Sequence, residues 1–488
     1  MSRQDPRTAG GEGGRTGHAG AGARAHETGA AANEHGAEMV HGLATPWAHF
    51  FAAIILGLWL ITSPLSFDYG DAALVVSDVV SGTLIIVFAT ITLARRSSWA
   101  PWANALVGVW LLFAPLVFWA PTAASYVNDT LAGILVIAFV LLMPGMPGMR
   151  MLPGPDAPPG WSYNPSTWVQ RAPIIALALV GFLLSRYMTA YQLGYIDSVW
   201  DPFFDPGTAA VLDSDVSAAF PISDAGLGAV AYMIEGLMGF MGDRQRWRTM
   251  PWMVTFFGIL VVPLGVATVT LMMLQPVAVG EWCTVCLIAV GAMLLMIALT
   301  LDEVVAMGLF LASTRREGES LWRAFWLGGT LRDPGGDRRT RPDVVSVPAM
   351  IWGTGAPWNL VATVALGVWL IVSAAVLDLS GAASDTTIIL GALVVVVAMI
   401  ALAEVTRAAR FVNILFGAWF IVSPWFLSGT TTAAAWNGVA VGVALILLSL
   451  PRGAVRESYG GWDRYVDWPG PRGGAARRAP VAAQRGRR

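Results

Sequence analysis

The chain has 488 residues, of which 56% are hydrophobic and only 13% are charged. A soluble protein of this composition would expose a very large apolar surface, so the composition excludes a soluble globular enzyme and indicates a polytopic membrane protein. The formal net charge of −2 is close to neutral. We expect the lipid bilayer as a partner and no nucleic acid.

Residues 1–46 are rich in Gly and Ala and lack the apolar stretch of a signal peptide. We therefore expect a disordered cytoplasmic tail, followed by an uncleaved first span at about 47–66. All five histidines lie before this span or at its edge. The rest of the chain, with two cysteines and no imidazole, is not expected to bind a metal.

Apolar stretches long enough to cross a bilayer occur at twelve places. We therefore predict an all-α polytopic membrane protein with about twelve transmembrane helices. The predicted spans lie near 47–66, 73–94, 102–120, 128–144, 173–192, 222–242, 251–274, 282–301, 357–377, 386–404, 411–427 and 436–450.

Arginine occurs only in every second loop between these spans, and the chain has no lysine. Basic loops of membrane proteins stay on the cytoplasmic side. We therefore predict a multi-pass protein of the cell inner (plasma) membrane with both termini in the cytoplasm. The arginine-free loops, expected to face outward, are 67–72, 121–127, 193–221, 275–281, 378–385 and 428–435.

A short pattern of glycine, tryptophan and a small residue is repeated within residues 47–145 and again within 357–450. It begins at Gly57-Leu-Trp59, Gly108-Val-Trp110, Gly367-Val-Trp369 and Gly417-Ala-Trp419. A second helix follows each time, begun by a polar residue: Asp78, Asp129, Asp385 or Asn437. Small residues at these spacings are typical of closely packed membrane hairpins. The pattern resembles the SPW-repeat family, whose motif is complete here only at Ser423-Pro424-Trp425. The resemblance implies two pairs of membrane hairpins and no known activity, and we expect them to serve as a scaffold.

Three connecting segments separate these regions. Residues 146–172 are expected to form a Pro/Gly-rich linker, residues 314–356 an Arg-rich cytoplasmic connector, and residues 451–488 a cytoplasmic tail. The remaining region, 173–313, is expected to form a central bundle of four helices.

Cys283 and Cys286 are the only cysteines in the chain, and they stand where the last helix of the central bundle begins. A Cys-x-x-Cys pair at a helix N-terminus brings two sulfurs within bonding range, and the helix dipole there favours a thiolate. Such a pair can alternate between dithiol and disulfide. The alternative is that both are small buried residues of a membrane helix.

The central region resembles the vitamin K epoxide reductase family, four-helix membrane proteins that oxidise thiols and pass the electrons to a quinone. The resemblance rests on the order of several elements. They are a first span ending near Tyr191, an outer loop with Thr208-Ala-Ala-Val211 and Phe220-Pro221, a second span with Ser223-Asp224 and Tyr232, and a fourth span opening with Trp282-Cys283-Thr-Val-Cys286.

The resemblance implies a role for individual residues. Cys286 would lie nearest the quinone, menaquinone or ubiquinone, and Cys283 would exchange with an incoming thiol. Asp224 would hydrogen-bond a quinone carbonyl, although an acid at this position also caps a helix. The remaining residues expected to bind the quinone are Phe220, Tyr232 and Trp282.

Two departures from the family pattern concern the supply of electrons. The family carries two further cysteines in the outer loop, and Trp200 and Thr208 stand at the matching positions. Val290 replaces an aromatic residue that contacts the quinone. We therefore expect a separate extracytoplasmic thioredoxin-like protein to react with Cys283 directly.

Glu235 lies about 11 residues into the second span, a depth of about 16 Å at the rise of an α-helix. A carboxyl group at this depth is costly and usually functional. It is a candidate proton relay for quinone reduction, or a neutral side chain hydrogen-bonded between helices.

Two hypotheses for the function follow. The chain is either a membrane thiol–disulfide oxidoreductase that passes electrons through Cys283 and Cys286 to a quinone, or a catalytically degenerate scaffold or transporter-like protein. The cysteine pair favours the first hypothesis, since a scaffold has no need of it.

Overall fold

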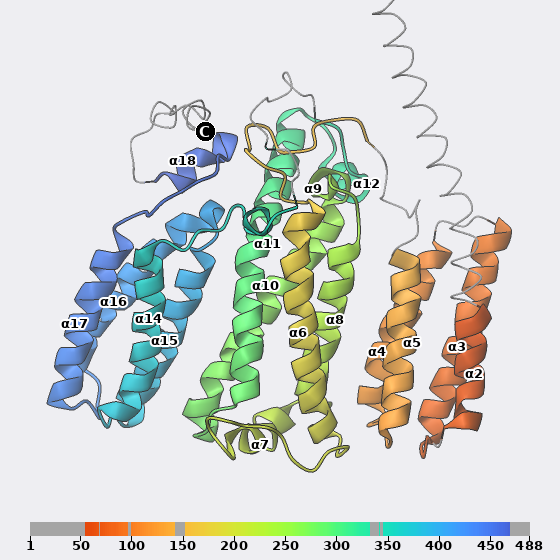
Figure 1. Ribbon diagram of the computed structural model, residues 1–488, viewed down its shortest axis with the longest axis horizontal. Coiled ribbons are helices and arrows are strands. Elements are labelled where there is room, and N and C mark those ends of the chain that lie inside the picture. Colours follow the sequence, from red (N-terminus) through yellow and green to blue (C-terminus); the bar gives the residue numbers. More distant parts are fainter. Residues whose placement is uncertain are drawn as a thin grey trace, which may run out of the picture.

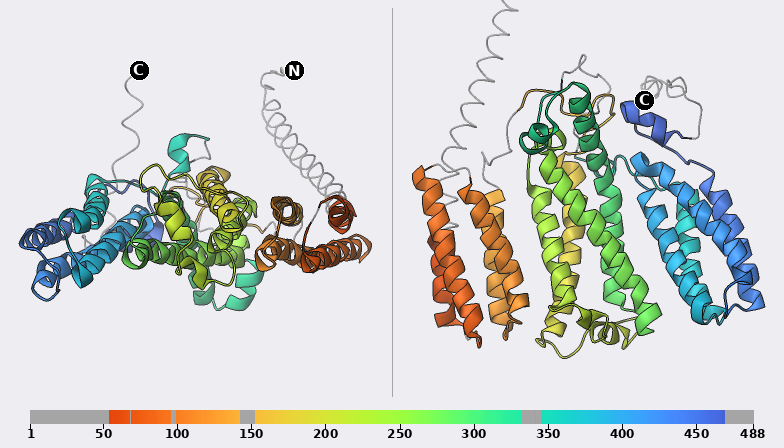
Figure 2. Two further views of the ribbon diagram at one scale, coloured as in Figure 1. Left: turned by 90° about the horizontal axis from the view of Figure 1, so that it is seen from below. Right: turned by 180° about the vertical axis from the view of Figure 1, so that it is seen from behind.

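The computed structural model describes residues 54–67, 69–95, 99–141, 152–331, 341 and 345–468. The expected disordered tail at 1–46, the start of the first span, part of the Arg-rich connector and residues 469–488 lie outside these ranges. The described residues form helices and no strands, apart from two isolated β-bridges. The helices make three groups that stand side by side, with the first and last groups on opposite flanks of the central one (Figures 1 and 2).

The expectation of an all-α polytopic membrane protein is confirmed. By length and composition, ten of the described helices could each cross a membrane. An eleventh, α8, qualifies together with the segment Gly207–Ala219 before it, across a bend of 87°. The described part of the first helix, α2, is shorter, because the residues before it lie outside the described ranges.

The first group, here called the N-terminal repeat pair, contains two helical hairpins. Its helices are α2 (Leu56–Ser66), α3 (Ala72–Arg95), α4 (Ala100–Val117) and α5 (Ala123–Leu141). The last group, the C-terminal repeat pair, has the same arrangement. Its helices are α14 (Trp358–Val376), α15 (Gly381–Ile400), α16 (Val412–Val422) and α17 (Thr432–Ser449), with a 3-10 segment (Glu404–Phe411) before α16.

Glycines set the distance between the two helices of each hairpin. A Cβ atom on Gly133 would stand 2.7 Å from the carbonyl oxygen of Gly108, closer than real Cβ atoms approach. The same contact joins Gly57 to Gly82, Gly367 to Gly391 and Gly417 to Gly442. The repeated glycines therefore permit direct backbone packing, as the sequence pattern predicts.

The central group is a bundle of four helices. They are α6 (Trp168–Gln192), α8 (Asp224–Phe240), α10 (Pro251–Leu274) and α11 (Thr284–Arg316). Helix α11 continues well past its predicted end at 301. Hydropathy predicts an end there because Asp302 and Glu303 follow, but in the structure both side chains are buried and hydrogen-bonded by neighbouring segments.

The two ends of the molecule differ in their arginine content. The turns without arginine lie together at one end, here the arginine-free end, beside the short helix α7 (Gly207–Leu212) (Figure 1). The other end, the arginine-rich end, carries four short helices: α9 (Arg246–Thr249), α12 (Leu321–Leu327), α13 (Val347–Met350) and α18 (Asp463–Val466). This separation agrees with the alternation of basic loops. The orientation of the two ends relative to the cell stays a prediction.

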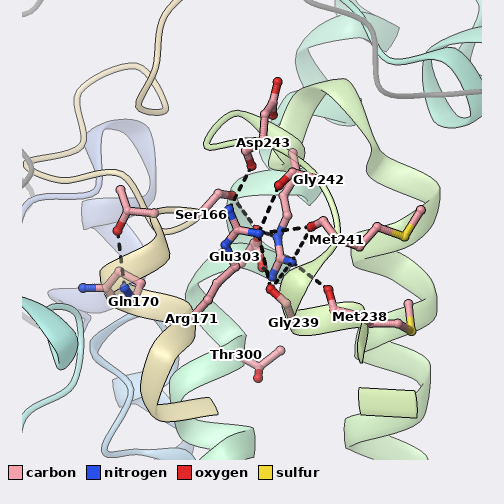
Figure 3. A network of polar contacts seen from close by, with 12 residues as sticks. Ser166, Gln170, Arg171, Met238, Gly239, Met241, Gly242, Asp243, Thr300 and Glu303 are labelled. Atoms are coloured by element: carbon pink, nitrogen blue, oxygen red, sulfur yellow. Dashed lines mark hydrogen bonds and ion pairs between the residues drawn. The ribbon is translucent and has the colours of Figure 1, made fainter. Parts of the chain in front are cut away.

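A buried ionic network fixes the arginine-rich end of the central bundle (Figure 3). Arg246 makes two parallel hydrogen bonds of 2.6 Å with the carboxylate of Glu303. Ser166 donates to the same carboxylate, and Arg171 donates to the carbonyl oxygens that end α8, including that of Met241 at 3.1 Å. Both partners of the ion pair are almost fully buried, so either charge alone would be strongly destabilising.

The expected linker and the start of the expected tail pack together at the same end. Trp161 forms a β-bridge with Tyr459, and both are buried. Tyr163 donates a hydrogen bond to the buried Asp302 of α11. Residues 152–167 and 455–466 thus belong to the folded structure, because aromatic side chains in these Pro- and Gly-rich segments bury themselves against α11.

Candidate functional site

The two cysteines form a disulfide bond at the first turn of α11. Cys283 is the N-cap residue: its backbone is extended, and its sulfur accepts the N–H of Cys286 at 3.1 Å. The Cα atoms are 5.2 Å apart. The turn therefore holds both sulfurs at the positive end of the helix dipole, in reach of each other.

The two sulfurs have different surroundings. Cys283 is completely buried, and its N–H donates to the side-chain oxygen of Gln275 at 3.1 Å. Cys286 is partly buried, lies 3.4 Å from the sulfur of Met188, and lines a cavity. One sulfur therefore faces an internal space, while the other is covered.

The cavity beside Cys286 has a volume of about 120 Å³ and lies between α6, α8, α10 and α11. Three of the residues expected to act with a quinone line it together: Cys286, Asp224 and Tyr232. Phe220 and Trp282 do not line it. Phe220 lies exposed at the arginine-free end, and the ring of Trp282 packs against Phe204.

Asp224 stands at the first turn of α8 and is held in place by its neighbours. One oxygen of its carboxylate accepts hydrogen bonds from Gln192 at 2.6 Å and from Ser217 at 2.8 Å. Ser223 is the N-cap, since its hydroxyl accepts the N–H of Gly226. Ser223 thus caps the helix, and Asp224, whose carboxylate also accepts the N–H of Ala225 at 2.8 Å, lines the cavity. Gln192 was not anticipated, because a lone glutamine at a helix end carries no pattern.

Tyr232 and Glu235 lie one helical turn apart on α8. The hydroxyl of Tyr232 donates to the carbonyl of Ala289 at 2.9 Å, and its ring packs directly on Gly181. Glu235 is completely buried, and neither of its carboxylate oxygens has a hydrogen-bond partner among the described residues. Glu235 does not line the cavity beside Cys286. Along α8, Tyr232 lies between Glu235 and that cavity.

Residues 200–208, here called the lid, contact the residues on both sides of Cys283, Trp282 and Thr284. The carboxylate of Asp201 accepts the N–H of Thr208 at 2.8 Å and the hydroxyl of Thr208 at 2.6 Å. It also accepts the hydroxyl of Thr284, the first residue of α11. One aspartate thus ties the lid to the helix that carries the cysteines.

The same contacts determine the charge of Asp201. Partial burial by itself raises the pKa of this carboxyl group, but hydrogen bonds from Thr208, Thr284 and backbone amides outweigh it. The net result is a pKa well below its usual range. Asp201 is therefore ionised at neutral pH and accepts all of these hydrogen bonds.

The lid also approaches the backbone next to Cys283. Gly207 lies directly against the carbonyl group of Trp282. Thr208, at one of the two positions where the family carries a loop cysteine, is completely buried, whereas Trp200, at the other, is 60% exposed. A protein partner cannot reach the sulfur of Cys283 while the lid is in this position.

Comparison with known protein families identifies two kinds of region. Residues 172–301 match the profile of the vitamin K epoxide reductase family, and residues 46–143 and 357–451 match that of the SPW repeat domain. Both resemblances seen in the sequence, and their order along the chain, are confirmed. Among curated proteins no match to the chain was found. Among solved structures there was likewise none.

Proposed function

We propose that this protein is a membrane thiol–disulfide oxidoreductase that passes electrons from a partner dithiol through Cys283 and Cys286 to a membrane quinone. The observation that carries the proposal is the disulfide whose second sulfur, Cys286, lines a cavity together with Asp224 and Tyr232. The match of residues 172–301 to the vitamin K epoxide reductase family supports the same chemistry.

The reaction consists of two exchanges that balance. One thiol of a partner dithiol attacks the disulfide at Cys283 and releases Cys286 as a thiol. The second thiol of the partner then attacks the mixed disulfide, so the partner departs as a disulfide and Cys283 becomes a thiol. The thiols then lose two electrons and two protons to the quinone, which becomes a quinol, and the Cys283–Cys286 bond forms again. The structure contains the oxidised protein, the state that awaits a partner dithiol.

The cavity suits a quinone ring rather than a whole quinone. Its volume of about 120 Å³ is below the roughly 300 Å³ at which typical ligand pockets begin. Its lining includes Gly228 of α8 and both Thr268 and Leu271 of α10. An isoprenoid tail would therefore leave between α8 and α10, into the bilayer. Either menaquinone or ubiquinone fits this arrangement.

Two carboxyl groups on α8 would move the protons. Asp224 lines the cavity. When ionised, its carboxylate accepts a hydrogen bond from a hydroxyl group, and when neutral, it donates a hydrogen bond to a carbonyl oxygen. Glu235 lies one turn deeper than Tyr232 and has no hydrogen-bond partner in the described structure. We assign proton transfer at the ring to Asp224, and a relay further from the ring to Glu235.

Electrons enter at the arginine-free end, which is the extracytoplasmic end if the basic loops are cytoplasmic. The lid must open first, because Cys283 is completely buried beneath it. Phe203, 78% exposed, and Trp200 lie on the lid and offer an apolar contact to a thioredoxin-like partner. The protein would work in the plasma membrane, where extracytoplasmic disulfides persist.

The decisive experiment is alkylation trapping of the cysteines in isolated membranes. The two cysteines should be oxidised in quinone-replete membranes and become alkylatable when quinone is depleted, then oxidise again when quinone is restored. Asp224→Ala should slow the reoxidation without changing the amount of protein, and Asp385→Ala, outside the central bundle, should not. If both thiols stay alkylatable whatever the quinone content, the protein is a scaffold that has lost the chemistry.

A further inference from the structure

The N-terminal repeat pair contains a buried polar cluster outside the cysteine site. Asp78 of α3 and Asp129 of α5 are both completely buried. Tyr69 donates to Asp78 at 2.6 Å, and Tyr69 in turn contacts Ser63 at 2.9 Å and accepts from Asn128 at 2.8 Å. These residues join three of the four helices of the repeat pair near the arginine-free end.

The two carboxyl groups of the cluster face each other. The side chains of Asp78 and Asp129 act on each other, and Tyr69, which donates to Asp78, also accepts from Asn128, the residue directly before Asp129. The second oxygen of Asp78 and both oxygens of Asp129 have no hydrogen-bond partner among the described residues. A carboxyl–carboxyl contact is a hydrogen bond only if one of the two groups carries a proton.

No basic side chain of the described residues interacts with either carboxyl group. The titratable groups that act on the pair are the hydroxyls of Tyr69 and Tyr195. Arg186 of α6 acts on Tyr126, whose ring packs against Tyr195. Two ionised carboxylates in contact, in an apolar surrounding, would repel each other strongly.

The C-terminal repeat pair serves as an internal comparison. Its Trp369–Asn437–Ser373 hydrogen bonds repeat those of Trp59, Asn128 and Ser63 in the N-terminal pair. Four residues before the packing glycines Gly82 and Gly133 stand Asp78 and Asp129, whereas Thr387 and Gly438 stand four residues before Gly391 and Gly442. Asp385 is therefore not the counterpart of Asp78. The expectation that these residues begin their helices is wrong, because α3 begins at Ala72 and α15 at Gly381.

The corresponding place in the C-terminal pair is lined by no carboxyl group. A cavity of about 20 Å³ lies there, lined by Thr387 and Gly438. The repeat fold with its tryptophan–asparagine–serine contacts thus forms without the acids. The two aspartates and Tyr69 are an addition in one pair, and packing does not account for them.

We infer that Asp78 and Asp129 form a proton-binding site in which the two carboxyl groups share one proton. Tyr69 lies in the turn before α3 and connects the site to the arginine-free end, from which the proton is exchanged. The N-terminal repeat pair then has a ligand of its own, and its role extends beyond supporting the central bundle.

Infrared difference spectroscopy of the full chain in lipid nanodiscs tests the inference. The spectrum of the wild type minus that of Asp78→Asn/Asp129→Asn at pH 7 should contain one protonated carboxyl band and one set of carboxylate bands. The difference between wild type and Asp385→Asn supplies the area expected for a single aspartate. A second double variant, Asp78→Thr/Asp129→Gly, copies the C-terminal pair and should give the same difference spectrum, so a folding defect of one variant does not decide the result.

Three outcomes overturn the inference. Two sets of carboxylate bands with no protonated band mean that both groups are ionised. Two protonated bands without carboxylate mean that each acid holds its own proton. A protonated band that disappears when sodium replaces potassium in the buffer means that a metal cation, rather than a proton, occupies the site.

Discussion

A Cβ atom on Gly207 would stand 2.2 Å from the carbonyl oxygen of Trp282, the residue that precedes Cys283. No side chain fits between these two backbones. The lid therefore closes over the disulfide only because position 207 is glycine. This contact and the Asp201 hydrogen bonds are separate restraints on access to Cys283, and each can be removed alone.

Gly207→Ala should hold the lid away from α11 and expose Cys283. In a reduced Cys286→Ser background, we expect Cys283 to be alkylated about tenfold faster than with Gly207, which corresponds to about 1.4 kcal/mol of lid closure. The measurement is the rate of modification by a membrane-impermeant maleimide. Gly291→Ala is the control, since nothing lies within 4 Å of a Cβ atom there. Equal rates in all three proteins would show that the lid does not limit access.

Asp201→Asn should loosen the lid at every pH. The N–H of Thr208 donates to the Asp201 carboxylate, so its hydrogen exchange reports lid closure. Because the pKa of Asp201 lies below its ordinary value of 3.8, the wild type should keep this protection from neutral pH down to about 4. Protection should be lost as the pH falls further, through the lowered pKa.

The Asp201→Asn protein should show neither the protection nor its pH dependence. Asp205→Asn, on the exposed part of the same lid, should resemble the wild type. Wild-type protection that declines between about pH 8 and 6 would contradict the assignment, because a carboxylate with a lowered pKa does not titrate there.

Cys286→Ser should trap the incoming partner. Its Cys283 thiolate can attack a partner that is in the disulfide form and displace one partner thiol. Without Cys286 this chain has no second thiol to release the partner, so the mixed disulfide appears as a reductant-sensitive band on a gel. Cys283→Ser is the matched control and should give no band, because Cys286 faces the cavity and not the lid. A well-expressed Cys286→Ser protein without such a band would indicate that the chain no longer oxidises thiols.

Arg246→Met should lower the free energy of unfolding by about 3–5 kcal/mol, because it leaves the buried Glu303 carboxylate without its charge partner. Adding Glu303→Leu should restore much of the loss, since the uncompensated charge is then gone. Reversible unfolding in mixed micelles measures both. The pair of Arg244 and Asp156 is the control: its side chains are both 48% exposed, so Arg244→Ala should cost less than about 1 kcal/mol.

Reporter fusions should place the two ends of the molecule on opposite sides of the membrane. A reporter at residue 330, at the arginine-rich end, should be active in the cytoplasm, and one at residue 205, in the lid, should be active outside. The same side for both reporters would refute the arrangement. A reversed result, with residue 205 in the cytoplasm, would remove the disulfide from the compartment that sustains it.

Hydropathy and motif spacing were sufficient for the helices and the cysteines. Each long helix corresponds to an apolar segment of the sequence, and such segments determine most of the fold of a helical membrane protein. The start of α11 at Cys283 was predictable, because the cysteine pair follows the arginine-free turn directly. The end of α11 was not. Asp302 and Glu303 are acidic in the sequence, and only the arrival of Tyr163 and Arg246 from other segments allows them to be buried.

The contacts of the lid and the surroundings of Asp224 could not be predicted for a related reason. Asp201, Gln192 and Ser217 lie in or beside a long outer loop without periodicity, and each acts through a partner distant in sequence. Asp201 is one acid among several in that loop, so the composition does not single it out. Its hydrogen bond to Thr284 crosses 83 residues, a separation that no local pattern encodes.

The contact between Trp161 and Tyr459 has a consequence for the order in which the protein is made. Tyr163 and Asp302 meet early in synthesis, but Tyr459, which packs over them, is translated about 160 residues after Asp302. At roughly 5–20 residues per second, the ribosome takes about 8–30 s to reach it. During this interval the arginine-rich end of the central bundle lacks this cover, and Asp302 is not yet buried beneath Tyr459. The last described segment of the chain therefore completes a structure whose cysteine pair was synthesised long before.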